Sequence, residues 1–107
     1  HNYHWHVTGP EFISLHAMFE GQYNELFTAV DAIAERVRAL HHQAPATFKE
    51  FSKISEMTEG KSNFSAKKMV SDLFQSHQSI SSFLEKAIAR AGDVNDYVSQ
   101  DLLISRK

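Results

Sequence analysis

Four side chains that can bind a metal ion occur as two pairs in one stretch of this sequence. His16 precedes Glu20 by four residues, and Asp31 precedes Glu35 by four residues. On a helix, residues four apart lie one above the other, and at about 100° per residue all four side chains fall within roughly 100° of arc. They therefore share one face. Imidazole nitrogen and carboxylate oxygen without sulfur suit iron, zinc or manganese, and iron where positions stay open for an oxidant.

The helix that must carry this face is predicted over residues 10–41. Apolar side chains recur along it at alternating steps of three and four, which is typical of the buried seam of a helical bundle. They are Phe12, Leu15, Phe19, Tyr23, Leu26, Val30, Ile33, Val37 and Leu40. The centre of this seam lies roughly 120° around the helix from the centre of the metal-capable face. That face is therefore expected to point away from the chain's own core.

The two pairs are too far apart to share one metal ion within a single chain. From His16 to Asp31 the helix rises by about 22 Å. A second copy packed antiparallel about a two-fold axis would bring His16 and Glu20 of one chain against Asp31 and Glu35 of the other, twice per dimer. The axis would pass near residues 24–27. The spacing thus favours a homodimer with two shared sites.

The rest of the chain is also predicted to be helical. Pro10 suits the first turn of the long helix, and Thr47 and Glu50 are expected to form a capping box. Gly92 is expected to end the helix before it, and Asp93 to cap the last helix. The predicted segments are the end of a helix over 1–6, a long helix over 10–41, a short helix over 47–53, a helix over 66–91 and a last helix starting at about 94.

Composition limits the class of protein. A chain of 107 residues forms at most one domain, and 42% apolar with 22% charged residues is ordinary for a globular protein. No apolar run is long enough for a membrane span, so no membrane partner is expected. The absence of cysteine excludes thiolate metal sites and fits a cytoplasmic location. The net charge of −2 gives no support for nucleic-acid binding.

The stretch HNYHWHVTGPEFISLHAMFEGQYNELFTAVDAIAERVRAL resembles the first-to-second-helix signature of the Dps family, the ferritin-like proteins of starved bacteria. That signature has His-Trp, then Gly, Phe, a Leu-His pair, an acidic residue four positions later and an Asp-x-x-Ala-Glu-Arg block, and all are filled here. The resemblance covers residues 1–107, with DLLISRK matching the opening of the family's last helix. It implies an all-α, ferritin-like four-helix bundle subunit with a short helix in the central connection, here truncated at both ends.

The resemblance also implies a set of site residues. His4 and His16 of one chain would face Asp31 and Glu35 of its two-fold mate, and Glu20 would take the family's remaining acidic position. Together they would form an intersubunit ferroxidase centre for iron, which zinc or another divalent metal can also occupy.

Three further residues receive roles from the same resemblance. Trp5 would lie beside the centre, and our own hypothesis is that it quenches stray radicals there. Asp101 matches a family position in the three-fold pores through which iron enters, and Asp96 is shifted by one from another. The implied activity is oxidation of Fe²⁺, preferably by hydrogen peroxide, with storage of ferric mineral in a cytoplasmic, dodecameric shell built from two-fold dimers. Consuming both reagents would protect DNA from oxidative damage.

Other interpretations stay open from the residues alone. The metal-capable face can be a solvated helix face with a chance histidine. His1, His4 and His6 can form an adventitious metal-binding cluster, and His77, within an apolar stripe, is expected as a hydrogen-bonded core residue. The rival function is a DNA-compacting, nucleoid-associated structural protein in which metal binding is incidental. A third is a helical bundle without metal.

Overall fold

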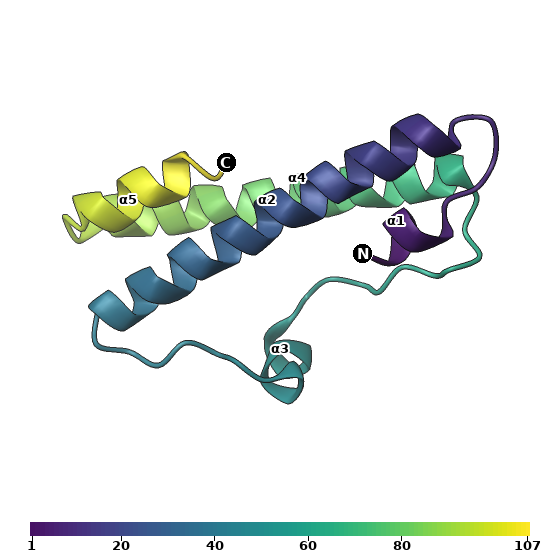
Figure 1. Ribbon diagram of the computed structural model, residues 1–107. Coiled ribbons are helices and arrows are strands. Elements are labelled where there is room, and N and C mark those ends of the chain that lie inside the picture. The colour runs from purple at the N-terminus through teal and green to yellow at the C-terminus, as the bar shows by residue number, and fades with distance from the viewer. The chain divides into compact units, whose positions relative to one another are not determined.

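The computed structural model describes residues 1–107 and is built from helices joined by loops (Figure 1). In chain order they are α1 (Asn2–His6), α2 (Phe12–Ala39), α3 (Phe48–Ile54), α4 (Ala66–Asp93) and α5 (Tyr97–Ile104). The all-α prediction is confirmed, and the bounds of α2, α3 and α4 differ from the expected ones by at most two residues. None of these helices is both long and apolar enough to cross a membrane.

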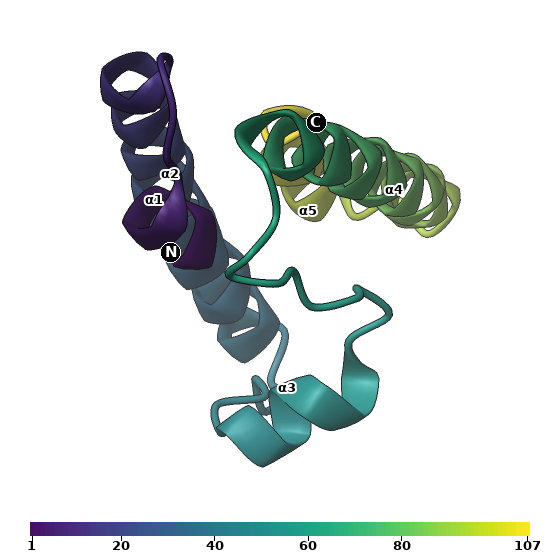
Figure 2. The ribbon, with the colours of Figure 1, turned by 90° about the vertical axis from the view of Figure 1, so that its right-hand side faces the viewer.

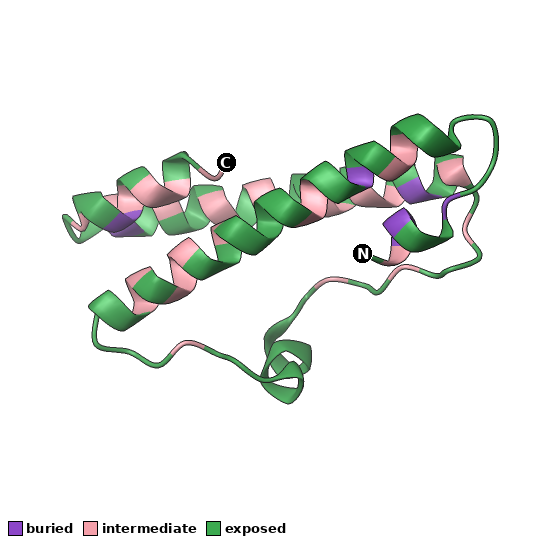
Figure 3. Cartoon of the chain, in the orientation of Figure 1, coloured by how far each residue is buried: buried purple, intermediate pink, exposed green.

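The chain forms two compact units, residues 1–70 and residues 71–107. In the first unit α1 folds back along the first half of α2, as the two perpendicular views show (Figures 1 and 2). The buried side chains of this unit are Tyr3, His4, Val7, Phe19 and Met69. Most other residues of α2 are exposed or half-buried (Figure 3). The best-packed part of the unit is therefore the junction between α1 and α2.

A tight turn at Gly9 makes this junction. Gly9 has a φ of 100°, a conformation that side chains with a Cβ adopt only at a cost, and its carbonyl accepts a hydrogen bond from the N–H of Phe12 at 3.1 Å. Pro10 lies within the turn, so α2 begins two residues later than the sequence predicts. The turn reverses the chain and sets α1 against α2.

The C-terminal end of α2 places a histidine in the left-handed region. His41 has a φ of 64°, and its N–H donates to the carbonyl of Arg38 at 2.9 Å. The N–H of His42 donates to the carbonyl of Val37 at 3.2 Å, which completes the six-to-one bond of a Schellman motif. Glycine usually fills this position, so His41 gives up stability here.

The predicted capping box at α3 is confirmed. The Thr47 hydroxyl accepts from the N–H of Glu50 at 3.2 Å, and Oε2 of Glu50 accepts from the N–H groups of Thr47 at 2.9 Å and Ala46 at 2.8 Å. These hydrogen bonds, first that from Ala46 and then that from Thr47, lower the pKa of the Glu50 carboxyl below its ordinary value. The capping box therefore fixes the residue at which α3 begins.

In the second unit α4 does not end where the sequence predicts. Asn95 holds the left-handed position with a φ of 58°, and the N–H of Asp96 donates to the carbonyl of Ala91 at 2.9 Å. Asp96, rather than Asp93, then caps α5, because its Oδ1 accepts from the N–H of Ser99 at 3.1 Å. The last helix starts at Tyr97 instead of about residue 94.

Gly92 lies inside α4 rather than ending the helix, and it packs beside the side-chain amide of Gln100. A Cβ at Gly92 would lie 2.6 Å from Nε2 of Gln100, whose amide lies 3.4 Å from the carbonyl of Ile88. The unit is also joined by an ion pair at 2.6 Å between Lys107 and Glu85. The hydrogen bond and the charge of Lys107 lower the pKa of Glu85. Because both side chains are exposed, this pair adds little stability.

Candidate metal centre

Three metal-capable side chains come together where α1 lies against α2. His4 comes from α1, and His16 and Glu20 come from successive turns of α2. Each offers one ligand atom, and these atoms all lie within 4.8 Å of one another. His4 is buried, His16 is half-buried and Glu20 is exposed. The group is thus compact enough for one metal ion and open on the carboxylate side.

Hydrogen bonds fix which nitrogen of each imidazole is free. Nδ1 of His4 lies 2.8 Å from the backbone carbonyl of His16, and Nδ1 of His16 lies 2.8 Å from the backbone carbonyl of His4. A carbonyl oxygen only accepts, so each Nδ1 carries the proton and donates. In a neutral ring the lone pair is then on Nε2, which is the arrangement seen in histidine ligands of metals. Both histidines are oriented for metal binding before any metal arrives.

Aromatic rings surround the histidine pair. The His4 and His16 rings stack with centroids 3.8 Å apart and an interplanar angle of 19°. Phe12 lies 4.9 Å from the His16 ring, and the Tyr23 ring meets the His4 ring edge-on at 5.2 Å. These contacts limit how far either imidazole can rotate. Tyr23 was predicted only as a seam residue, although its position two helical turns after His16 indicates the same side of the helix.

Trp5 lies at the edge of this ring system rather than against the histidine pair. Its side chain is 69% exposed, and its ring contacts His1 at 5.6 Å, which in turn contacts Tyr23 at 4.1 Å. His6 lies outside the cluster as well, because its Nδ1 donates to the carbonyl of Asn2 at 2.9 Å. The histidines at positions 1, 4 and 6 therefore do not converge on one point, and among them only His4 stacks on His16.

The second predicted pair lies elsewhere on α2. Asp31 and Glu35 are exposed, and Asp31 follows His16 by about 22 Å of helical rise, so neither reaches the cluster in the same chain. The same face of α2 carries two strongly exposed apolar side chains, Ile13 at 82% and Phe27 at 78%. A face that combines exposed carboxylates with exposed large apolar groups is suited to packing against another protein surface.

The remaining predicted residues lie in the second unit. Asp96 is half-buried and caps α5, and Asp101 is exposed on α5. His77 is exposed on α4, so the expectation of a core histidine is wrong. The prediction assumed that the apolar stripe of α4, in which His77 lies, is buried. In the structure many apolar side chains of this stripe are exposed or half-buried.

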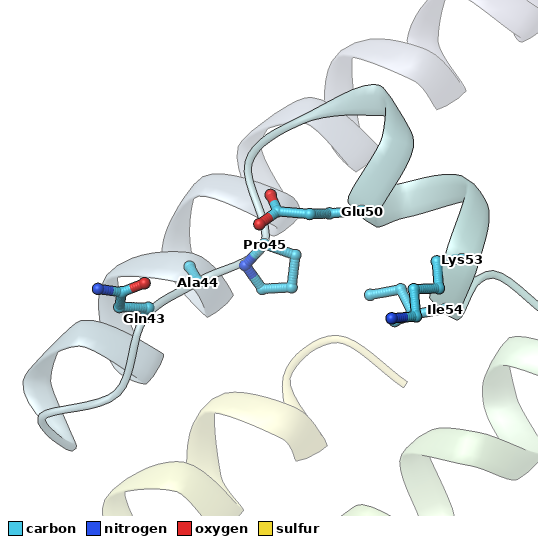
Figure 4. A pocket seen from close by; sticks show the side chains of 6 residues that line it. All are labelled: Gln43, Ala44, Pro45, Glu50, Lys53 and Ile54. Atoms are coloured by element: carbon cyan, nitrogen blue, oxygen red, sulfur yellow. The ribbon is translucent and has the colours of Figure 1, made fainter.

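One open pocket lies apart from these residues. It has a volume of about 260 Å³ between the loop after α2 and the helix α3 (Figure 4). Its lining residues are Gln43, Ala44, Pro45, Glu50, Lys53 and Ile54. Oε2 of Glu50, one of these residues, already accepts hydrogen bonds from the N–H groups of Ala46 and Thr47 at the start of α3. It contains none of the predicted metal ligands.

The donor set of the cluster suits a transition metal. Two imidazole nitrogens and one carboxylate oxygen bind iron or zinc and leave several coordination positions open. The Nδ1–H bonds to backbone carbonyls hold the ligand orientation, as outer-sphere partners do in metalloproteins. Further carboxylates would complete the set, and Asp31 and Glu35 of this chain are too distant to supply them.

Comparison with known proteins gives consistent matches over nearly the whole chain. The model of the ferritin-like domain family matches residues 1–106. The chain is 36% identical to DNA protection during starvation protein 2 of Bacillus anthracis over 104 residues, which is 97% of this chain and 71% of that protein.

Solved structures agree with the sequence matches. A Dps from Staphylococcus aureus has a TM-score of 0.96 and 42% identity, covering 99% of this chain and 71% of that one. A Dps from Vibrio cholerae, described as a member of a broad superfamily of ferritin-like diiron-carboxylate proteins, has a TM-score of 0.95 and 25% identity, covering 98% and 66%.

Proposed function

Because this chain belongs to the Dps family of ferritin-like proteins, we propose that it oxidises Fe²⁺ at a centre shared between two subunits and stores the ferric product in a protein shell. One observation carries the proposal. His4, His16 and Glu20 converge within 4.8 Å, and the hydrogen bonds of both imidazoles leave Nε2 free for a metal ion.

The second half of the centre would come from the Asp31 and Glu35 carboxylates of another copy. If α2 packs antiparallel on its copy, the pairings of His16 with Glu35 and of Glu20 with Asp31 have the same midpoint, between residues 25 and 26. One two-fold axis therefore satisfies both pairings. The exposed Ile13 and Phe27 on this face support its burial in such a dimer, from which a dodecamer would be built.

The chemistry follows from the ligands. Carboxylate oxygens stabilise Fe³⁺ more than Fe²⁺, because the higher charge gains more from anionic ligands, and this favours oxidation of the bound substrate. With hydrogen peroxide as oxidant, two Fe²⁺, one peroxide and two protons give two Fe³⁺ and two waters. The reaction removes both reagents that generate hydroxyl radicals. This accounts for DNA protection without contact to DNA, for which a net charge of −2 gives little attraction.

The roles of the protein groups are to bind and orient. The backbone carbonyls of His4 and His16 hold the two rings, Glu20 supplies the first carboxylate, and the partner subunit supplies the others. Asp96 and Asp101 are proposed to concentrate Fe²⁺ electrostatically where it enters the shell.

The test compares two exposed acidic residues of α2 that lie on different faces of the helix. Asp31 belongs to the metal-capable face, and the exposed Glu25 lies roughly 120° to 130° away from its centre. Each protein is loaded with Fe²⁺ without oxygen, pulsed with hydrogen peroxide and followed by near-ultraviolet absorbance. Asp31→Ala is expected to slow oxidation strongly, and Glu25→Ala to match the wild type. Equal, slow oxidation in all three proteins would refute the proposed ferroxidase activity.

A further inference from the structure

The loop before α4 contacts Asn2 and Tyr3, the two residues of α1 that precede His4. Nδ2 of Asn2 donates to the carbonyl of Gly60 at 3.0 Å, and the hydroxyl of Ser62 donates to Oδ1 of Asn2 at 3.2 Å. The Phe64 ring lies 6.2 Å from the Tyr3 ring. These contacts join segments about 60 residues apart in the sequence. Residues 60–64, here called the clasp, thus hold the first turn of α1.

Gly60 is required at the clasp for space. A Cβ on Gly60 would lie 2.0 Å from Oη, 2.4 Å from Cζ and 2.7 Å from Cε1 of Tyr3, far closer than van der Waals contact allows. The backbone of Gly60 is not in the left-handed region, so lack of room is the only obstacle to a side chain. Tyr3 is buried and its ring contacts both Phe19 and Phe64, so it has little freedom to move aside.

Tyr3 and His4 are consecutive residues of a helix that cannot hold its place alone. α1 has five residues and no side-chain cap, and a helix of that length is unstable without tertiary contacts. Contacts with the clasp and with α2 therefore set its position. Displacing Tyr3 away from Gly60 moves the backbone that carries His4, and with it the 2.8 Å hydrogen bonds that orient the His4–His16 pair.

From this arrangement we propose that Gly60, with Asn2 and Ser62, positions His4 for metal binding, although none of the three touches the metal site itself. They are positioning residues. The inference rests on the proposed metal centre and adds determinants of its affinity outside the ligand set, of which Gly60 and Ser62 lie at least 25 residues from any proposed ligand in the sequence. The clasp would act through Tyr3, with the ligands themselves unchanged.

The experiment measures Zn²⁺ affinity by calorimetry and the Co²⁺ visible spectrum, which reports ligand geometry, on the assembled full-length protein. Gly60→Ala is compared with Gly21→Ala, a matched control because a Cβ on Gly21 meets nothing within 4 Å. Gly60→Ala is expected to weaken Zn²⁺ binding by about 10- to 100-fold, the usual effect of losing an outer-sphere support, and to alter the Co²⁺ spectrum. Gly21→Ala should leave both unchanged. Circular dichroism verifies that helix content is retained.

Each outcome decides a separate point. If the wild type binds Zn²⁺ and Gly60→Ala binds it equally well with the same Co²⁺ spectrum, the positioning role is refuted and the metal centre stands. If the wild type binds no Zn²⁺, the metal centre and the positioning role both fall. If Gly60→Ala fails to fold, Asn2→Ala takes its place, since it removes two hydrogen bonds without a clash. Weaker Zn²⁺ binding by Asn2→Ala supports the proposal, and wild-type binding refutes it.

Discussion

Mixing two inactive variants tests whether the metal centre is shared between chains. His16→Ala damages the imidazole half of the centre, and Asp31→Ala damages the carboxylate half. In a dimer of either variant alone, both sites carry a lesion. In a mixed dimer one site carries both lesions, whereas the other joins an intact His16 to an intact Asp31. Activity is therefore expected to return on mixing.

The geometry sets the size of this recovery. Because about 22 Å of helical rise separates His16 from Asp31, one chain cannot supply both residues to one site. Random pairing of equal amounts makes half of the dimers mixed, and each mixed dimer has one intact site of two, so about a quarter of all sites recover. If instead each site were formed within one chain, every site would keep its lesion and nothing would return.

The assay needs dissociation and joint reassembly of the two purified variants, followed by Fe²⁺ loading and a peroxide pulse. The matched control mixes His16→Ala with Glu20→Ala. Both of these lesions lie in the same half of the centre, so no combination of chains produces an intact site. Recovery to about a quarter of the wild-type rate in the first mixture alone is the expected result. No recovery there, or equal recovery in both mixtures, would show that the shared centre is wrong.

Three further predictions concern single positions. Replacing His41, with its φ of 64°, by glycine should stabilise the protein by about 0.5–1 kcal/mol, whereas His42→Gly, at a position without positive φ, should not; thermal melting distinguishes them. The hydrogen bonds from Ala46 and Thr47 lower the pKa of Glu50, so the stability that they give to α3 is fully present above the ordinary carboxyl pKa and is lost as the pH falls through the lowered value. Hydrogen exchange of the α3 amides should show this loss. In Glu50→Gln the pH dependence should disappear. Trp5→Phe should raise the yield of spin-trapped radicals during iron oxidation, and an unchanged yield would remove Trp5 from that role.

Local signals in the sequence predicted local structure well. The capping box of Thr47 and Glu50 formed as expected, because both partners lie within one turn of the same helix. The boundary between α4 and α5 was predicted wrongly for a physical reason. Gly92 looked like a helix stop, but α4 continues to Asp93, and the residue with positive φ lies further along the chain. Asn95 takes the left-handed position instead.

The candidate site was predictable in parts. The spacing of His16 and Glu20 on a helix indicates a shared face without any knowledge of the fold. His4 entered only through family resemblance, because helical periodicity ends at Gly9 and carries no information across the turn. The exchange of hydrogen bonds between His4 and His16 depends on the angle of that turn. No pattern within one chain can describe ligands that a second chain would supply.

The two imidazoles belong to different helices, and this couples metal loading to the mechanics of the α1–α2 junction. An ion that binds only the docked arrangement stabilises it by about 2.7 kcal/mol when free ion exceeds the Kd a hundredfold. For a helix of five residues, this is a large part of the free energy that keeps it docked against α2. When metal is scarce, the turn at residues 7–11 would open and be cut by a protease more often than in the metal-loaded protein. Proteolytic resistance of this turn would then serve as a gauge of metal occupancy.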